Sequence, residues 1–178
     1  MHRVLFLAGI VCLAVSTPIL AQESREKAVV NKAATSKLTT IPNAPDCFTA
    51  LVEHGDPGKE PSVMLMKATA GCAVPWHWHP STEQVMMVSG TARADVKGDK
   101  PAVLQPGDYL FVPPHHVMRF TCSSACTLFV STDGVFVIHY VNEAGQEIPP
   151  DEALKRPKKT TQAPKRQKAN QARCNEQD

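Results

Sequence analysis

Two histidines and one glutamate within seven residues are the side chains of this sequence best suited to metal chemistry. His77 and His79 lie two residues apart in a stretch with strand character, so both imidazoles are expected to leave the chain on the same face. Glu83 follows a turn at Pro80 and Ser81, and we expect it to open the second strand of a hairpin. Two imidazoles and a carboxylate form a donor set that divalent transition metals bind. Without a metal, the same residues would form a hydrogen-bonded polar cluster.

The residues around this cluster alternate between two faces. Val85 and Met87 share the face of Glu83, and we expect them to line a pocket. The opposite face carries four apolar side chains: Trp76, Trp78, Met86 and Val88. That face is more apolar than a monomer usually leaves in water, which predicts a homodimer formed by sheet packing.

The elements that must position these residues are short strands. Runs of Val, Ile, Leu, Met, Phe and Thr are broken by Gly, Pro, Asp or Ser, which is typical of an all-β sandwich or barrel. The predicted strands are residues 48–53, 62–69, 74–79, 84–89, 92–96, 109–112, 117–121, 127–131 and 136–141. No Gly-rich phosphate loop and no G-x-S-x-G elbow is present, which excludes kinase, Rossmann and hydrolase functions of the usual types.

One motif resembles a known family. The pattern G-x5-H-x-H-x3-E-x6-G is filled by Gly71, His77, His79, Glu83 and Gly90, and it resembles the first conserved motif of the cupins. A second stretch, residues 107–114, resembles the second cupin motif, G-x5-P-x-G-x2-H. The resemblance covers residues 48–140 and implies a double-stranded β-helix, also called a jelly-roll barrel.

The second motif departs from the family pattern. His115 stands where the cupin glycine is expected, and Met118 stands at the position of the fourth metal ligand, usually a histidine. Three arrangements remain open: a three-ligand site, a site completed by His116, or Met118 bound to copper. A two-His, one-carboxylate triad suits non-haem iron, whereas a thioether favours Cu(I). The sequence leaves the cofactor open among Fe, Mn, Zn and Cu.

The resemblance implies three kinds of function. The first is a metal-dependent oxidoreductase, similar to a dioxygenase, that acts on a small organic molecule and uses Glu83 as a metal ligand or as a catalytic base. The second is a non-catalytic module that binds a small ligand or a metal. The third is a sugar isomerase, because one fold hosts many activities.

The 178 residues divide into four segments. Residues 1–21 have a basic start and a short apolar run, as in a cleaved signal peptide, which predicts a secreted or periplasmic protein. Residues 22–45 are expected to be flexible, and residues 46–145 to form the barrel. Residues 146–178 are expected to hold a short helix, at 150–154, and then a basic disordered tail.

Charge is distributed unevenly along the chain. The total net charge is +2, but residues 22–154 hold ten basic and fifteen acidic residues, whereas residues 155–173 hold eight basic residues and no acid. The tail is therefore expected either to bind an anionic surface or only to improve solubility. No aromatic residues or nucleic-acid motif accompany it, so sequence-specific nucleic-acid binding is not predicted.

Five cysteines remain after removal of the expected signal peptide, and an exported protein can keep disulfides. Cys122 and Cys126 flank three residues, which predicts a hairpin stapled by a disulfide. A bridge between Cys47 and Cys72 is the second prediction.

Overall fold

The computed structural model describes residues 27–155, so the predicted signal peptide and the basic tail lie outside the described residues. The chain divides into two units, residues 1–30 and 31–178, and the described part of the first unit, residues 27–30, forms no helix or strand. Among residues 27–155, no helix is long and apolar enough to cross a membrane.

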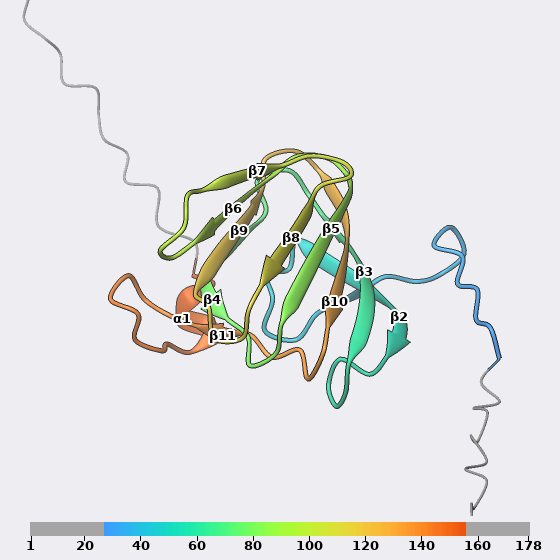
Figure 1. Ribbon diagram of the computed structural model, residues 1–178, viewed down its shortest axis with the longest axis horizontal. Helices are drawn as coiled ribbons and strands as arrows, with labels where there is room; N and C mark the ends of the chain where they lie inside the picture. The colour runs from blue at the N-terminus through green and yellow to red at the C-terminus, as the bar shows by residue number, and fades with distance from the viewer. Residues whose placement is uncertain (1–26, 156–178) are drawn as a thin grey trace, which may run out of the picture. The chain divides into compact units, whose positions relative to one another are not determined.

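The second unit consists of two antiparallel sheets, which confirms the predicted all-β, double-sheet fold (Figure 1). The six-stranded sheet has the order β1 (Thr39–Thr40), β2 (Phe48–Gly55), β3 (Ser62–Ala68), β10 (Cys126–Thr132), β5 (Glu83–Ser89) and β8 (Tyr109–Val112). The five-stranded sheet has the order β11 (His139–Tyr140), β4 (Ala73–Trp78), β9 (Met118–Cys122), β6 (Ala92–Val96) and β7 (Ala102–Leu104). A short helix, α1 (Pro150–Ala153), follows Pro149.

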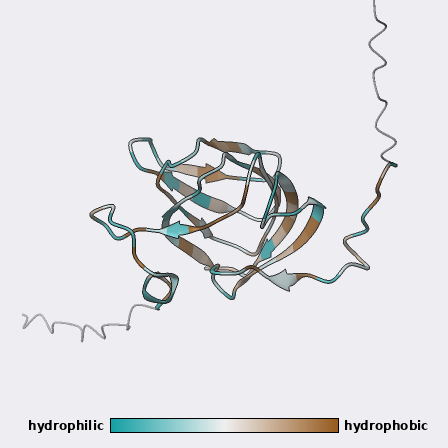
Figure 2. Ribbon diagram, turned by 90° about the horizontal axis from the view of Figure 1, so that it is seen from below, coloured by the Kyte–Doolittle hydropathy of each residue, from teal (hydrophilic) through white to brown (hydrophobic). Residues whose placement is uncertain are grey.

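Alternating burial explains why these segments form strands around one core. Along β10, every second residue from Cys126 to Thr132 is buried, and β5 repeats this pattern at Glu83, Val85 and Met87. Such a period of two places one set of side chains between the sheets. Figure 2 shows the brown, hydrophobic segments in the strands, whereas much of the connecting chain is teal.

The last predicted strand, residues 136–141, is mostly irregular. Only β11, two residues long, pairs with β4. Phe136 leaves the strand pattern because its backbone N–H donates to the carbonyl oxygen of Pro57, at 2.8 Å, instead of to a neighbouring strand. The segment before β11 therefore lies beside the barrel interior without belonging to either sheet.

The structure corrects the predicted apolar face. Trp76 and Trp78 lie in β4 of the five-stranded sheet, whereas Met86 and Val88 lie in β5 of the six-stranded sheet, so the four do not share one surface. The guanidinium carbon of Arg119 lies 4.6 Å from the Trp76 ring centroid, and Trp78 stacks on the histidine of β11 with 3.9 Å between ring centroids. Both tryptophans thus pack within their own sheet, while Val88 stays exposed.

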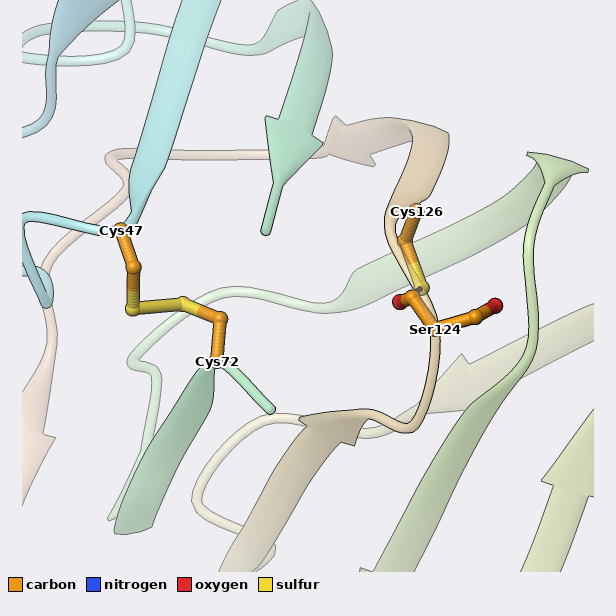
Figure 3. Close-up of a disulfide and its surroundings, with 4 residues drawn as sticks. All are labelled: Cys47, Cys72, Ser124 and Cys126. Atoms are coloured by element: carbon orange, nitrogen blue, oxygen red, sulfur yellow. Dashed lines mark hydrogen bonds between the residues drawn. A yellow bond between two sulfur atoms is a disulfide. The ribbon is translucent and has the colours of Figure 1, made fainter. Parts of the chain in front are cut away.

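The disulfide prediction was wrong in its first choice and right in its second. Cys47 is bonded to Cys72, across 25 residues of chain, and Figure 3 shows this bridge apart from Cys126. Cys122 and Cys126 are free and buried. They do not face each other across a hairpin, because β9 and β10 belong to different sheets. Burial, and then the neighbouring Cys126 thiol, raise the pKa of Cys122 above its usual range, so this thiol stays protonated.

Candidate metal site

The structure brings together the three side chains that the sequence singled out. His77 lies in β4, His79 directly after it, and Glu83 is the first residue of β5. One potential ligand atom of each lies within 4.8 Å of the others. All three residues are buried, with exposed fractions of 3%, 4% and 7%. Since such polar groups are rarely buried without a partner, their convergence calls for a bound species.

The route by which they meet differs from the prediction. The turn between His79 and Glu83 does not close a hairpin but carries the chain from one sheet to the other. His77 pairs with Met118 of β9, while Glu83 pairs with Thr132 of β10. The ligands therefore approach from the two opposing walls of the barrel, and the cluster faces its interior.

Two backbone carbonyls fix the orientation of the imidazoles. Nδ1 of His77 lies 2.7 Å from the carbonyl oxygen of Pro75, and Nδ1 of His79 lies 2.7 Å from that of Val137. A carbonyl oxygen can only accept, so Nδ1 of each ring carries a proton and donates it, which leaves Nε2 as the nitrogen that could bind a metal. Metal-bound histidines usually donate their second ring N–H to a carbonyl or carboxylate in this way, which fixes the orientation of the ring.

Two of the three atoms left for a metal have no hydrogen-bond partner in the part of the chain that the structure describes. Nε2 of His79 and Oε2 of Glu83 are buried, have no hydrogen-bond partner among the described residues, and lie 3.8 Å apart. A polar cluster that served only the fold would satisfy these atoms internally. The donor set therefore fits a divalent transition metal better than it fits a structural hydrogen-bond network.

Burial also sets the protonation of the site. Burial, and then the charge of neighbouring His79, lower the pKa of His77 from 6.5 to about 3, so its imidazole is neutral at physiological pH. Burial raises the pKa of Glu83, and His79 opposes this only in part. Metal binding requires the carboxylate form and therefore releases the proton that Glu83 tends to keep.

The structure separates the candidates for a fourth ligand. Met118 is 1% exposed and lines the same cavity as the three ligands. His116 is exposed, its Nδ1 lies 3.2 Å from the carbonyl oxygen of Pro114, and it does not line this cavity. His115 is exposed with a φ of 61°, and its backbone N–H donates to the carbonyl oxygen of His79. Of the three, only Met118 lies at the site.

The cavity beside the ligands is small and apolar, with a volume of about 40 Å³. Besides the ligands and Met118, its lining is entirely apolar, including Val85, Phe120, Phe136, Ile41 and Ile138. The Phe136 ring stacks on the imidazole of His79, with 4.7 Å between centroids and an angle of 22°. Only a few water molecules can therefore reach the ligand atoms.

Sequence reasoning missed two parts of this site, one wall of the cavity and one backbone carbonyl. Ile41, Phe136 and Ile138 form one wall of the cavity, although residue 41 was assigned to a flexible segment and residues 136–138 to a strand. The carbonyl of Val137 that orients His79 is 58 residues away in the chain. No spacing signal relates these positions to the histidines, so the sequence alone offered no way to find them.

Comparisons with known proteins agree with this architecture. Residues 64–132 match the family described as cupin domain. The fold is similar to that of the DMSP lyase DddQ from Ruegeria pomeroyi DSS-3, with a TM-score of 0.53 and 21% identity over 64% of each chain. It is also similar to a RmlC-like cupin from Shewanella frigidimarina NCIMB 400, with a TM-score of 0.52 and 18% identity over 61% of this chain and 93% of that one.

A third similar structure is an acetylacetone dioxygenase from Acinetobacter johnsonii, with a TM-score of 0.54 and 13% identity over 72% of this chain and 86% of that one. The chain spans 64% of the length of the lyase. A search of curated proteins found no match. At these identities, the likeness to the solved structures concerns the fold alone.

Proposed function

Because the barrel of this chain is a cupin domain, we propose that it is a metal-dependent oxidoreductase of the dioxygenase type, acting on a small organic molecule. The observation that carries the proposal is the convergence of His77, His79 and Glu83 within 4.8 Å, with free lone pairs directed into a buried cavity. Three protein ligands leave coordination positions for exogenous ligands, as catalytic metal sites do.

The residues of the chain supply binding, orientation and a dry environment. His77 and His79 would hold the metal through Nε2, and Glu83 through its carboxylate. A metal held by these three residues would supply Lewis-acid chemistry to an oxygen atom of the substrate. Glu83 could also accept a proton, because burial raises its pKa above its usual range. The apolar walls keep bulk water from the reacting atoms.

A second candidate is a non-catalytic module that binds a metal or a small ligand. Met118 in the cavity favours it, since a soft thioether at the fourth position suits Cu(I) and would close the site. The third candidate, a sugar isomerase, lacks such support. A sugar needs many hydrogen-bond partners, whereas nearly every side chain that lines the cavity besides the ligands is apolar.

Metal analysis of the protein, purified without chelator or added metal, tests the proposal. We expect one iron or manganese ion per chain, its loss in His77→Ala, and its retention in the matched control His54→Ala, whose histidine is exposed in β2. Oxygen uptake with small diketones and diphenols then tests turnover. Copper that is lost in Met118→Leu would favour the binding module, and absence of any metal after reconstitution would refute both.

We further propose that the protein is exported and dimeric. The Cys47–Cys72 disulfide supports export, because such bonds persist in oxidising compartments. Val88 and Phe111, exposed on the six-stranded sheet, support a dimer packed through that sheet. The basic residues 155–173 remain a candidate for binding an anionic surface.

A further inference from the structure

The cavity at the ligands is too small for the substrate of the proposed reaction. About 40 Å³ holds a few water molecules, whereas small-molecule sites usually occupy about 300–1,000 Å³. A second pocket of about 310 Å³ lies directly beside it. We call it the outer pocket; it is lined by the segment 39–43, by Ala50 and Val52 of β2, by Met64 of β3, and by residues 57–58 and 136–138.

The two spaces share a wall of three apolar side chains. Ile41, Phe136 and Ile138 line both the cavity and the outer pocket. Of these, Phe136 stacks directly on the imidazole of His79. The hydroxyl of Tyr140 donates to the carbonyl oxygen of Asn43, at 2.8 Å, and so holds the chain beside Ile41 in place. The cavity and the outer pocket therefore meet at Ile41, Phe136 and Ile138.

The wall can open through Phe136 without disturbing the ligands. The neighbouring carbonyl of Val137 must stay in place, because it accepts the hydrogen bond that orients His79. The backbone N–H of Phe136 is likewise held by Pro57. Rotation of the phenyl ring about its own side-chain bonds leaves both contacts intact, and side-chain rotation is a fast motion.

The lining of the outer pocket indicates what it accepts. No charged side chain lines it, and its only polar side chains are those of Thr39, Thr40 and Asn43. A charged group would lose its hydration there without gaining a partner of opposite charge. A hydrocarbon chain or ring would gain about fourfold in affinity for each methylene that it buries.

We propose that the outer pocket binds the apolar body of the substrate and that Phe136 gates its contact with the metal ligands. The substrate class is a small molecule with one oxygen-donor head group and an uncharged hydrocarbon body that fits the outer pocket. The part of this inference that concerns the head group rests on the proposed function, whereas the apolar pocket does not depend on a metal.

The test uses straight-chain alkyl hydroxamates of increasing length, titrated into the Co(II)-loaded protein by calorimetry. We expect affinity to rise about fourfold for each added methylene until the pocket is full, and then to level off. Val52→Trp, at a residue 43% exposed at the pocket, should abolish this rise while leaving acetohydroxamate binding within about twofold. Val103→Trp, at a valine of β7 that is also exposed, by 59%, is the matched control and should behave as wild type.

The metal-free protein provides a second arm, in which 1-alkanols of four to eight carbons are titrated and the methyl signals of Met64 and Ile138 are followed by NMR. If affinity depends on the length of the alkanol and Val52→Trp removes this dependence, the outer pocket is supported even if the protein binds no metal. Failure of the proposed function and failure of this inference are therefore distinguishable. No chain-length dependence in either arm, or equal effects of Val52→Trp and Val103→Trp, would overturn the inference.

The role of Phe136 is tested by stopped-flow binding of hexanohydroxamate to the Co(II) protein. Phe136→Ala should raise the association rate at least about tenfold, since the wall no longer has to open, whereas Phe136→Leu, which keeps an apolar wall, should have an intermediate effect. A thermal melt establishes that both variants fold. Unchanged rates in two folded variants would refute the gate.

Discussion

Replacement of Glu83 by glutamine should stabilise the metal-free protein and abolish its response to metal. Glu83 is buried, and its Oε2 has no hydrogen-bond partner among the described residues. The Nε2 atom of His79, 3.8 Å away, is too distant for a good hydrogen bond. Glutamine has nearly the same shape and no charge. The substitution therefore removes the cost of burying a charge that, in the proposed function, serves as a metal ligand.

The expected size follows from the burial of an unpaired acid. A buried charge without a partner costs more than a buried neutral polar group without one, so Glu83→Gln should raise the free energy of unfolding by about 1–3 kcal/mol at a pH where Glu83 is ionised. The melting temperature should rise by several degrees. Because burial raises the pKa of Glu83 above 4.5 in the folded state, the folded protein keeps a proton that the unfolded chain releases. The advantage of glutamine is thus absent below about pH 4.5 and grows as the pH rises through the folded-state pKa.

Added metal should make wild type more stable than Glu83→Gln. Wild type at a metal concentration 100 times its Kd should gain about 2.7 kcal/mol, and Glu83→Gln much less. Thermal and urea unfolding, each with chelator and with added Mn(II) or Zn(II), measure both effects. Glu60→Gln, at an exposed glutamate, is the matched control and should change neither. A Glu83→Gln protein that is less stable without metal, and that gains as much from metal as wild type, would refute the assignment of Glu83 as a ligand.

Three further predictions concern the scaffold. Gly90→Ala should lower the free energy of unfolding in urea by more than about 2 kcal/mol, because φ is +83° and the added Cβ would lie 2.1 Å from the carbonyl oxygen of Ala125. A decrease below about 1 kcal/mol would contradict this geometry. Replacing Cys47 and Cys72 together by alanine should lower the free energy of unfolding by about 3.5 kcal/mol, because the disulfide closes a loop of 25 residues in the unfolded chain. Equal stability of the reduced and the oxidised wild type would contradict this. Sedimentation velocity should give a dimer for wild type and a monomer for Val88→Lys, whereas a monomeric wild type would contradict the dimer.

Local features of the site could be predicted from the sequence. His77, His79 and Glu83 lie within seven residues, so a strand period and one turn suffice to bring them near each other. The sequence could not tell whether that turn closes a hairpin or crosses between sheets, since both use the same short polar link. For the same reason, the segment between Cys122 and Cys126 was taken as a hairpin although it joins the two sheets.

Long-range features had no local signal. Cys47 and Cys72 meet because β2 pairs with β3 and β4 follows β3 in the chain. Ile41 reaches the cavity wall because Tyr140 holds the nearby Asn43, which lies 97 residues away in the sequence. Such contacts depend on how the sheets close on each other, which periodicity within one segment does not encode. The apolar lining of the outer pocket, and with it the inferred substrate class, follows from the coordinates alone.

Charge balance at the site connects the ligand set with the head group that a substrate must bring. Histidines bind a metal through an unprotonated nitrogen and Met118 carries no charge, so among the residues at the site Glu83 would supply the only negative charge for a divalent ion. The site would then keep one net positive charge in a cavity with apolar walls.

An uncompensated charge of this kind is costly, and the ion lowers the pKa of an oxygen that it binds. A head group that can lose a proton, such as an enol, a phenol or a hydroxamic acid, therefore binds more strongly than an ether or an alcohol of the same size. Met118 adds to this preference, because replacing a fourth anionic or imidazole ligand by a thioether leaves the ion more electron-poor and more dependent on the incoming oxygen.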